Sequence, residues 1–224
     1  MRDTAAVIDF LVEDCRPVRR LRSPGMRAAA WLALAFAVVA LVVAAHGLRP
    51  DLAEKLARPH AMLSLAAMLL TGISATVATF EVSVPGRPAR WALLPVPGLG
   101  LWLASLGWGC FDDWLRLGPD GLVLGHSFSC LKAILAISLP LGLLLLVMVR
   151  HAGAVRPHTT ALLAALAVSA LASAGLTLFH DLDTALMVLV WHLGPVALLM
   201  LAAWAAGERL FGWIGPVRSQ RTGS

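Results

Sequence analysis

Long apolar segments alternate with short polar ones along most of the chain. The apolar segments run over residues 26–47, 60–80, 91–108, 131–149, 160–179 and 184–206. A helix that crosses a bilayer needs about 20 mostly apolar residues, because the hydrocarbon core is roughly 30 Å thick. The pattern therefore predicts an all-α membrane protein whose six transmembrane helices form one membrane domain over residues 26–206.

Residues 1–25 form a polar leader with a different pattern. Apolar residues recur at helical spacing at Val7, Ile8, Leu11, Val12 and Cys15, and Pro17 ends the pattern. This spacing predicts a short amphipathic helix. Its polar face carries four acidic residues, Asp3, Asp9, Glu13 and Asp14. Helices that lie on anionic membranes carry Lys and Arg there. Of the two interpretations, a helix on the lipid surface or a helix docked into a groove of a cytosolic partner, the acidic face favours the second.

The composition and the distribution of charge predict how the chain is oriented in the membrane. Hydrophobic residues make up 59% of the sequence and charged residues 14%, and the mean hydropathy is +0.80, as in integral membrane proteins. If the N-terminus is cytoplasmic, 13 of the 18 Lys and Arg residues fall on the cytoplasmic side, where positive charge is retained. The sequence predicts both termini in the cytoplasm, with a cytosolic tail over 207–224. The high pI of about 10.1 indicates contact with anionic lipids, because no basic stripe with interleaved aromatics predicts nucleic-acid binding.

Most of the thiol and imidazole groups fall on the opposite, outer side. The candidate sensing residues there are Cys110, His126, Cys130, His180, Asp181, Asp183 and, inside the last apolar segment, His192. Imidazole and thiolate bind zinc, copper and related metals, and the four-residue step from His126 to Cys130 places both on one face of a helical turn. Cys110 and Cys130 have three open interpretations: a disulfide, free or metal-responsive thiols, or inert buried cysteines. His192 is either a polar packing residue or a sensor with His180, Asp181 and Asp183 as partners.

Several segments together resemble a known family. They include "LVEDCRPVRRLRSPGMRAAAWLAL", "GWGCFDDW", "LGHSFSC" and "LFHDLDTALMVLVWHLGPVALL". Their order and spacing are similar to those of the NrsF-type membrane-bound anti-sigma factors, most specifically in His126-Ser127-x-x-Cys130 and Trp191-His192. The resemblance implies a six-span inner-membrane protein that holds an extracytoplasmic-function sigma factor inactive and releases it under stress such as heavy metal or oxidant. It places sigma binding in the leader, with Val7, Ile8, Leu11, Val12 and Val18 as candidate contacts.

The sequence offers little support for an enzyme. It contains no Gly-rich phosphate loop, no His-Glu-x-x-His helix and no Gly-x-Ser-x-Gly elbow, so no catalytic, cofactor-binding or metal-binding residue is assigned. The alternatives are a small membrane redox protein that binds haem or metal, and a transporter-like protein. For a transporter, the apolar segments contain almost no charge with which to coordinate an ion.

Overall fold

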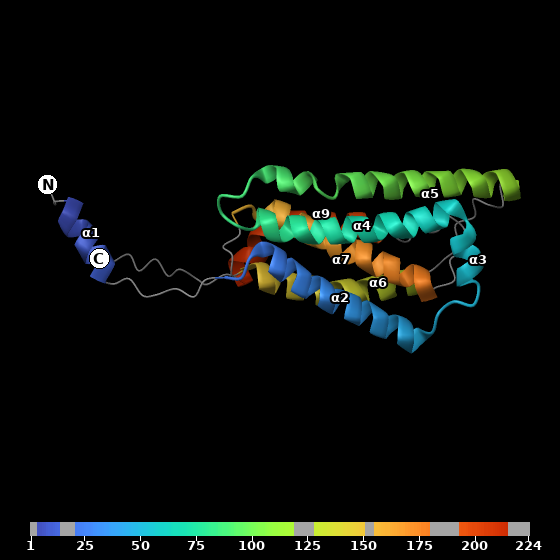
Figure 1. Ribbon diagram of the computed structural model, residues 1–224, viewed down its shortest axis with the longest axis horizontal. Helices are drawn as coiled ribbons and strands as arrows, with labels where there is room; N and C mark the ends of the chain where they lie inside the picture. The colour runs from blue at the N-terminus through green and yellow to red at the C-terminus, as the bar shows by residue number, and fades with distance from the viewer. Residues whose placement is uncertain (1–3, 14–20, 119–127, 151–154, 180–192, 215–224) are drawn as a thin grey trace.

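A computed structural model of the chain describes residues 4–13, 21–118, 128–150, 155–179 and 193–214, and in these ranges every regular element is a helix. The elements are α1 (Thr4–Glu13), α2 (Pro24–His46), α3 (Leu52–Ala57), α4 (Pro59–Val82), η1 (Ala89–Leu93), α5 (Val96–Leu117), α6 (Phe128–Arg150), α7 (Pro157–Phe179) and α9 (Gly194–Ile214). Figure 1 shows the long helices side by side in one elongated bundle. The expected all-α class is confirmed for the described residues.

Four segments are long and apolar enough to cross a membrane: Pro24–His46, Pro59–Val82, Ala89–Arg116 and Pro157–Phe179. They correspond to four of the expected spans. In α6 the apolar part, Ile134–Val149, is shorter. The last expected span begins among residues 184–192, outside the described part of the chain. A total of six spans therefore stays a prediction.

The third expected span differs from the observed helix at both ends. A 3-10 turn, η1, covers its start, and α5 begins only at Val96, after Pro95. At the other end α5 continues past Trp108 to Leu117. Hydrophobicity alone could not place this end, because the polar residues after Trp108 still have helical backbone.

The centre of the bundle is α7, whose residues from Thr160 to Leu176 are almost all buried and mostly small. It packs against α2, α4, α6 and α9, whereas α5 packs on the outer side of α4 (Figure 1). Small side chains allow helix backbones to approach closely in a membrane. A Cβ atom added at Gly72 would lie 2.7 Å from Leu171 Cγ, and one at Gly175 would lie 2.6 Å from Val39 Cγ1. The helices therefore approach each other closely at these two glycines.

Several buried polar side chains are paired with backbone carbonyls of the helices. Thr71, Thr76 and Thr79 of α4 each donate a hydrogen bond to the carbonyl four residues earlier, at 2.7–2.8 Å. The Trp31 indole donates to the Leu141 carbonyl at 3.3 Å and so joins α2 to α6. Back-bonding of this kind lets a hydroxyl lie in an apolar interior without an unpaired donor. The bundle therefore tolerates a threonine-rich helix next to its core.

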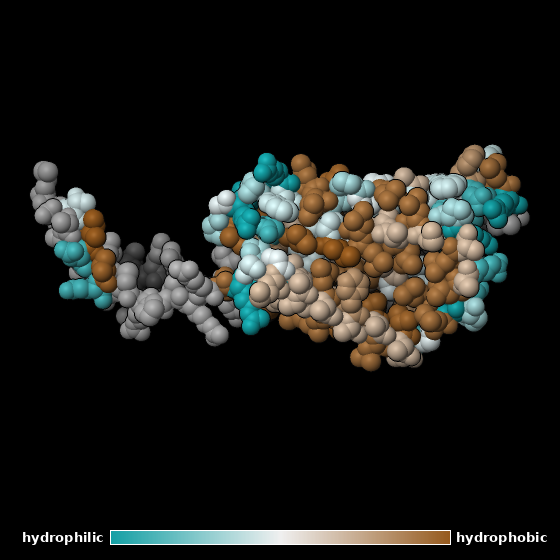
Figure 2. All heavy atoms as spheres, viewed as in Figure 1, coloured by the Kyte–Doolittle hydropathy of each residue, from teal (hydrophilic) through white to brown (hydrophobic). Residues whose placement is uncertain are grey.

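The surface of the bundle is divided into three zones. Figure 2 shows a broad hydrophobic band across the middle of one face, with hydrophilic residues gathered at the two ends. Large apolar side chains are exposed along the helices, among them Leu34, Leu41, Leu139, Leu198 and Leu201. A soluble protein rarely leaves so much contiguous apolar surface uncovered. The band is compatible with a membrane protein whose middle zone faces lipid.

Candidate functional site

The leader helix α1 presents apolar side chains to solvent. Its bounds, Thr4–Glu13, agree with the expected amphipathic helix. Ile8 and Val12, one helical turn apart, are 55% and 61% exposed, and Asp9 and Glu13 are exposed beside them. Of the other candidate contacts, Val7 and Leu11 lie in α1 but their side chains are outside the described part, as is Val18. The two described members of the apolar stripe thus have most of their side-chain surface available to a partner.

The start of α2 fixes where the leader joins the bundle. Ser23 caps this helix, because its hydroxyl accepts a hydrogen bond from the Met26 amide at 3.4 Å, and Pro24 occupies the first turn. One turn further on, Arg27 is only 8% exposed. Its guanidinium donates to the Met148 carbonyl of α6 and lies 5.1 Å from the centre of the Phe80 ring of α4. Arg27 therefore joins the ends of three helices.

Further ionic contacts surround this point. Glu81, also 8% exposed, pairs with Arg87 at 3.2 Å, and Arg156 donates to the Arg87 carbonyl at 3.2 Å. We call Arg27, Phe80, Glu81, Arg87 and Arg156 the inner junction, since it lies at the end expected to face the cytoplasm. From the sequence its arginines were predicted only to orient the chain, and their packing was not predicted. The available signal was Arg27 itself, a charged residue just inside an apolar segment, where charge is costly and usually has a structural or functional partner.

At the other end of the bundle, the start of α4 meets the end of α5. His60 Nδ1 lies 3.9 Å from Asp112 Oδ2, and Arg116 Nε lies 3.0 Å from the same oxygen. The His60 ring also lies against Trp108, with ring centres 6.4 Å apart. The His60–Asp112 pair was not predicted from the sequence. The folded chain brings them together because α4 and α5 run antiparallel.

The candidate sensing residues are only partly described. Cys110 lies half-buried in α5. Cys130 belongs to the first turn of α6, but its side chain is outside the described part of the chain. His126, His180, Asp181, Asp183 and His192 also lie outside the described residues. The three interpretations of Cys110 and Cys130 therefore stay predictions.

Candidate metal sites can be tested only in part. Among the residues that the structure describes, no group of three or more His, Cys, Asp and Glu side chains is close enough to hold a metal ion. His60 and Asp112 supply two such groups at most, and Arg116 already neutralises the carboxylate. The described part of this end of the bundle is an ion-paired contact between α4 and α5.

The loop between α2 and α4 contains a further ion pair that was not predicted from the sequence. Arg49, 5% exposed, forms two hydrogen bonds of 2.5 and 2.6 Å with Asp51, and its backbone amide donates to the Leu178 carbonyl at 3.1 Å. Nearby, the His46 and Phe179 rings stack 4.9 Å apart. These contacts fasten the α2–α3 loop to the end of α7. The hydrogen bond from Arg49 lowers the pKa of Asp51 to about 2.

The Arg49–Asp51 pair should make the stability of the fold depend on pH in the acidic range. Because the folded pKa of Asp51 lies below its ordinary value of 3.8, the pair stabilises the fold fully above that value. This contribution is lost as the pH falls through about 2. We expect Asp51→Asn to lower the unfolding temperature of the detergent-solubilised chain modestly at pH 5 to 7, with the difference from wild type disappearing near pH 2. Equal unfolding temperatures at neutral pH would show that the pair contributes nothing.

Comparison with known proteins decides the family. The model of NrsF, described as negative regulator of sigma F, matches residues 11–213, which include nearly all of the bundle and the end of α1. The chain belongs to the NrsF family. No curated protein and no solved structure matches the chain. Membership of NrsF implies a negative regulator of a sigma factor, and a sigma factor as its partner.

Proposed function

We propose that this NrsF-family protein is an anti-sigma factor of the bacterial inner membrane that captures an extracytoplasmic-function sigma factor with its cytosolic leader. The family match gives the class of partner. The observation that supports the place of capture is α1, which presents Ile8 and Val12 to solvent. An amphipathic helix that lays such a stripe into a partner's groove is a common way to bind protein.

The rest of the molecule serves this capture by holding the leader at the membrane. The apolar band and the long apolar helices support insertion in a bilayer. The inner junction anchors the first helix after the leader to α4 and α6. A sigma factor held at the membrane by α1 is kept from RNA polymerase.

Co-purification tests the proposed function directly. The tagged full chain is extracted in mild detergent from cells that express it together with a candidate extracytoplasmic-function sigma factor from the same genome. We expect that sigma factor to elute with the chain in equal amount, and transcription from its promoter to fall when the chain is expressed. A chain that reaches the membrane, yet retains no sigma factor and leaves transcription unchanged, contradicts the proposal.

Thiol labelling tests the orientation. With the leader in the cytoplasm, a membrane-impermeant maleimide added to intact, reduced cells should label Cys110 or Cys130 before Cys15, because only the first two lie on the outer side. Single-cysteine variants identify the labelled position. Preferential labelling of Cys15 would reverse the topology, and with it the assignment of the leader to sigma binding.

We further propose that Cys130 with His126 senses the stress, with Cys110, His180, Asp181, Asp183 and His192 as the other candidates. A neighbouring imidazolium favours the thiolate, which is the form that is oxidised or binds soft metals. The modifying agent can release the sigma factor only if it binds the sigma-free state more tightly than the sigma-bound state.

Replacing Cys130 tests this sensor. Cys130→Ser should still repress but should no longer respond to oxidant or heavy metal, and His126→Ala should show a weaker form of the same defect. Promoter activity and the amount of membrane protein are measured together. If Cys130→Ser and Cys110→Ser lower the amount of protein equally, the two cysteines form a structural disulfide. A normal response of Cys130→Ser at normal protein level excludes it as the sensor.

A further inference from the structure

A shallow groove lies beside η1 and the first turn of α5, at the end of the bundle that holds the inner junction. Its volume is about 390 Å³, and its lining residues are Arg90, Trp91, Leu93, Leu94 and Pro97. Leu93 and Leu94 are 66% and 40% exposed, so the groove opens to the outer surface of the bundle. Trp91 packs against a small buried cluster of α4 and α7, which fixes one wall of the groove to the bundle.

Arg90 is the one charged residue of this lining, and its side chain is exposed. In the part of the chain that the structure describes, its guanidinium forms no hydrogen bond or ion pair. The arginines of the inner junction differ. Arg27 is buried between helices, Arg87 pairs with Glu81, and Arg156 donates to the Arg87 carbonyl. Those three arginines hold elements of the bundle together, whereas the positive charge of Arg90 is available to a ligand.

The place of Arg90 along the chain sets its depth in the membrane. The segment that is long and apolar enough to cross a bilayer begins at Ala89, so Arg90 lies at its very end, where lipid headgroups lie. Pro97 lies two helical turns further along, roughly 10 Å deeper. The interfacial layer on each side of the hydrocarbon core is about 5–7 Å thick. The groove therefore extends from the depth of the lipid phosphates to the depth of the upper acyl chains.

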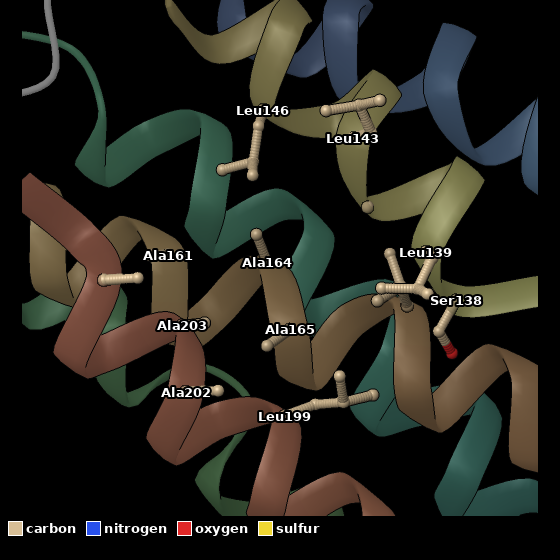
Figure 3. A pocket seen from close by; sticks show the side chains of 13 residues that line it. Ser138, Leu139, Leu143, Leu146, Ala161, Ala164, Ala165, Leu199, Ala202 and Ala203 are labelled. Carbon is tan, nitrogen blue, oxygen red and sulfur yellow. The ribbon is translucent and has the colours of Figure 1, made fainter. Parts of the chain in front are cut away.

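Two other hollows of the bundle show the contrast. The groove between α6, α7 and α9, of about 310 Å³, has leucines of α6 on one side and Leu199, Ala202 and Ala203 of α9 on the other (Figure 3). The hydroxyl of Ser138, its one polar residue, is buried and out of reach of a ligand. A hollow of about 610 Å³ between α2, α4 and α7 is lined by apolar residues and glycines alone. Such walls accept any hydrocarbon chain, whereas the groove at Arg90 joins an apolar wall to an accessible charge.

This combination limits the chemistry of the ligand. A guanidinium binds phosphate through parallel N–H donors. No carboxylate lines the groove to pair with the ammonium group of a zwitterionic headgroup, and Glu81 is already paired with Arg87. A soluble phosphate would leave the apolar surface of Leu93 and Leu94 uncovered. The ligand that fits is therefore anionic, carries a phosphate and has an acyl chain.

We propose that this groove binds one anionic phospholipid, with the phosphate on Arg90 and an acyl chain along Leu93, Leu94 and Pro97. Phosphatidylglycerol is the simplest such lipid, because it has one negative charge and no ammonium group. Basic pockets at the cytoplasmic side of membrane helices bind anionic headgroups in this way. The proposal rests on the membrane location proposed above but not on sigma binding.

Lipid binding to the full chain, delipidated in an uncharged detergent, tests the site. Dioctanoyl-phosphatidylglycerol and dioctanoyl-phosphatidylcholine have the same acyl chains and differ in net charge, and native mass spectrometry gives a Kd for each. We expect one phosphatidylglycerol to bind saturably and roughly fivefold more tightly than phosphatidylcholine, which is the gain expected for one arginine at an anionic headgroup. Arg90→Gln should remove this preference. Arg90→Lys keeps the charge and should keep most of it.

Two further variants separate the charge from the apolar wall. Arg209→Gln is the matched control, because Arg209 is also exposed and lies at the same end of the bundle on α9, but does not line the groove. It should leave both Kd values unchanged. Leu93→Asn removes apolar wall at an exposed position and leaves the charge in place. It should weaken the binding of both lipids alike, by about threefold or more.

Four results would overturn the proposal. The first is equal affinity of the wild-type chain for the two lipids. The second is an equal loss of preference in Arg90→Gln and Arg209→Gln, which would assign the attraction to the whole basic surface. The third is displacement of the lipid by excess glycerol 3-phosphate, which would identify a soluble phosphate as the ligand. The fourth is loss of sigma co-purification in Arg90→Gln with an unchanged lipid preference, which would assign the surface to a protein partner. Absence of a lipid preference in wild-type chain that still retains its sigma factor distinguishes failure of this site from failure of the proposed function.

Discussion

Replacing Ile8 and Val12 together with aspartate should abolish repression of the sigma factor while leaving the chain in the membrane at its normal level. Both side chains are exposed on α1 and leave the bundle core untouched, so the change should not affect insertion. It should affect capture, because the proposed contact with the sigma factor buries both of them. Repression is measured with a reporter of the sigma factor's promoter, and binding by co-purification.

The expected size of the effect follows from the remaining exposed area. Full burial of such a side chain is worth roughly 1.5–3 kcal/mol, and about half of that is left for a partner to bury. The two residues together then contribute roughly 1.5–3 kcal/mol, which weakens binding ten- to hundredfold at about 1.4 kcal/mol per tenfold. The new carboxylates must also be desolvated at the interface, which weakens binding further.

The acidic residues beside the stripe provide the matched control. Asp9→Asn with Glu13→Gln changes the same helix at two exposed positions without removing apolar area. This variant should repress nearly as well as wild type if the stripe provides most of the binding energy. Unchanged repression by the aspartate variant would show that α1 only rests on lipid. Loss of repression in the control alone would instead assign the contact to charge.

The helices could be predicted from the sequence because the length of each apolar segment can be read directly from the sequence, without knowledge of the fold. Four expected spans reappear as α2, α4, α5 with η1, and α7, and the leader helix as α1. The ends of the helices were predicted less well. Asp112 and Arg116 read as a loop after Trp108, yet they belong to the last turns of α5 and pair four residues apart there. Polar residues at a helix end carry the same composition signal as a loop, so hydropathy cannot separate the two.

The contacts between helices could not be predicted, because they depend on which helices pack together and on which of their ends lie side by side. His60 and Asp112 lie far apart in the sequence, and only the antiparallel packing of α4 and α5 pairs them. Arg27 looked like one orientation charge among many, whereas its burial against Phe80 and the Met148 carbonyl makes it a joint between three helices. The leader differed in this respect, since four of its candidate contacts, Val7, Ile8, Leu11 and Val12, share one helix and the helical period alone places them on one face.

The contact between α7 and α9 leads to the prediction with the largest effect on the fold. A Cβ atom added at Gly207 would lie 2.9 Å from the Cα atom and 3.0 Å from the amide nitrogen of His158. These are backbone atoms, so Gly207→Ala must push α9 away from α7. The His158 ring also contacts the Trp204 carbonyl at 2.6 Å and Glu208 at 3.4 Å, and the same shift would stretch both contacts. Overpacking of this kind costs about 1–3 kcal/mol, so the unfolding temperature in detergent should fall by roughly 2–10 °C.

Gly100 of α5 provides the control for this substitution, because no atom lies within 4 Å of a Cβ added there. Gly100→Ala should leave stability unchanged or raise it by up to about 1 kcal/mol, the usual gain from replacing glycine inside a helix. Gly207→Ala should also reduce the amount of chain in the membrane, and repression should fall only in proportion to that amount, since the leader is unaltered. An unfolding temperature equal to that of Gly100→Ala would show that α7 and α9 do not pack closely at this point. Repression lost beyond the loss of protein would mean that the contact between α7 and α9 takes part in holding the sigma factor.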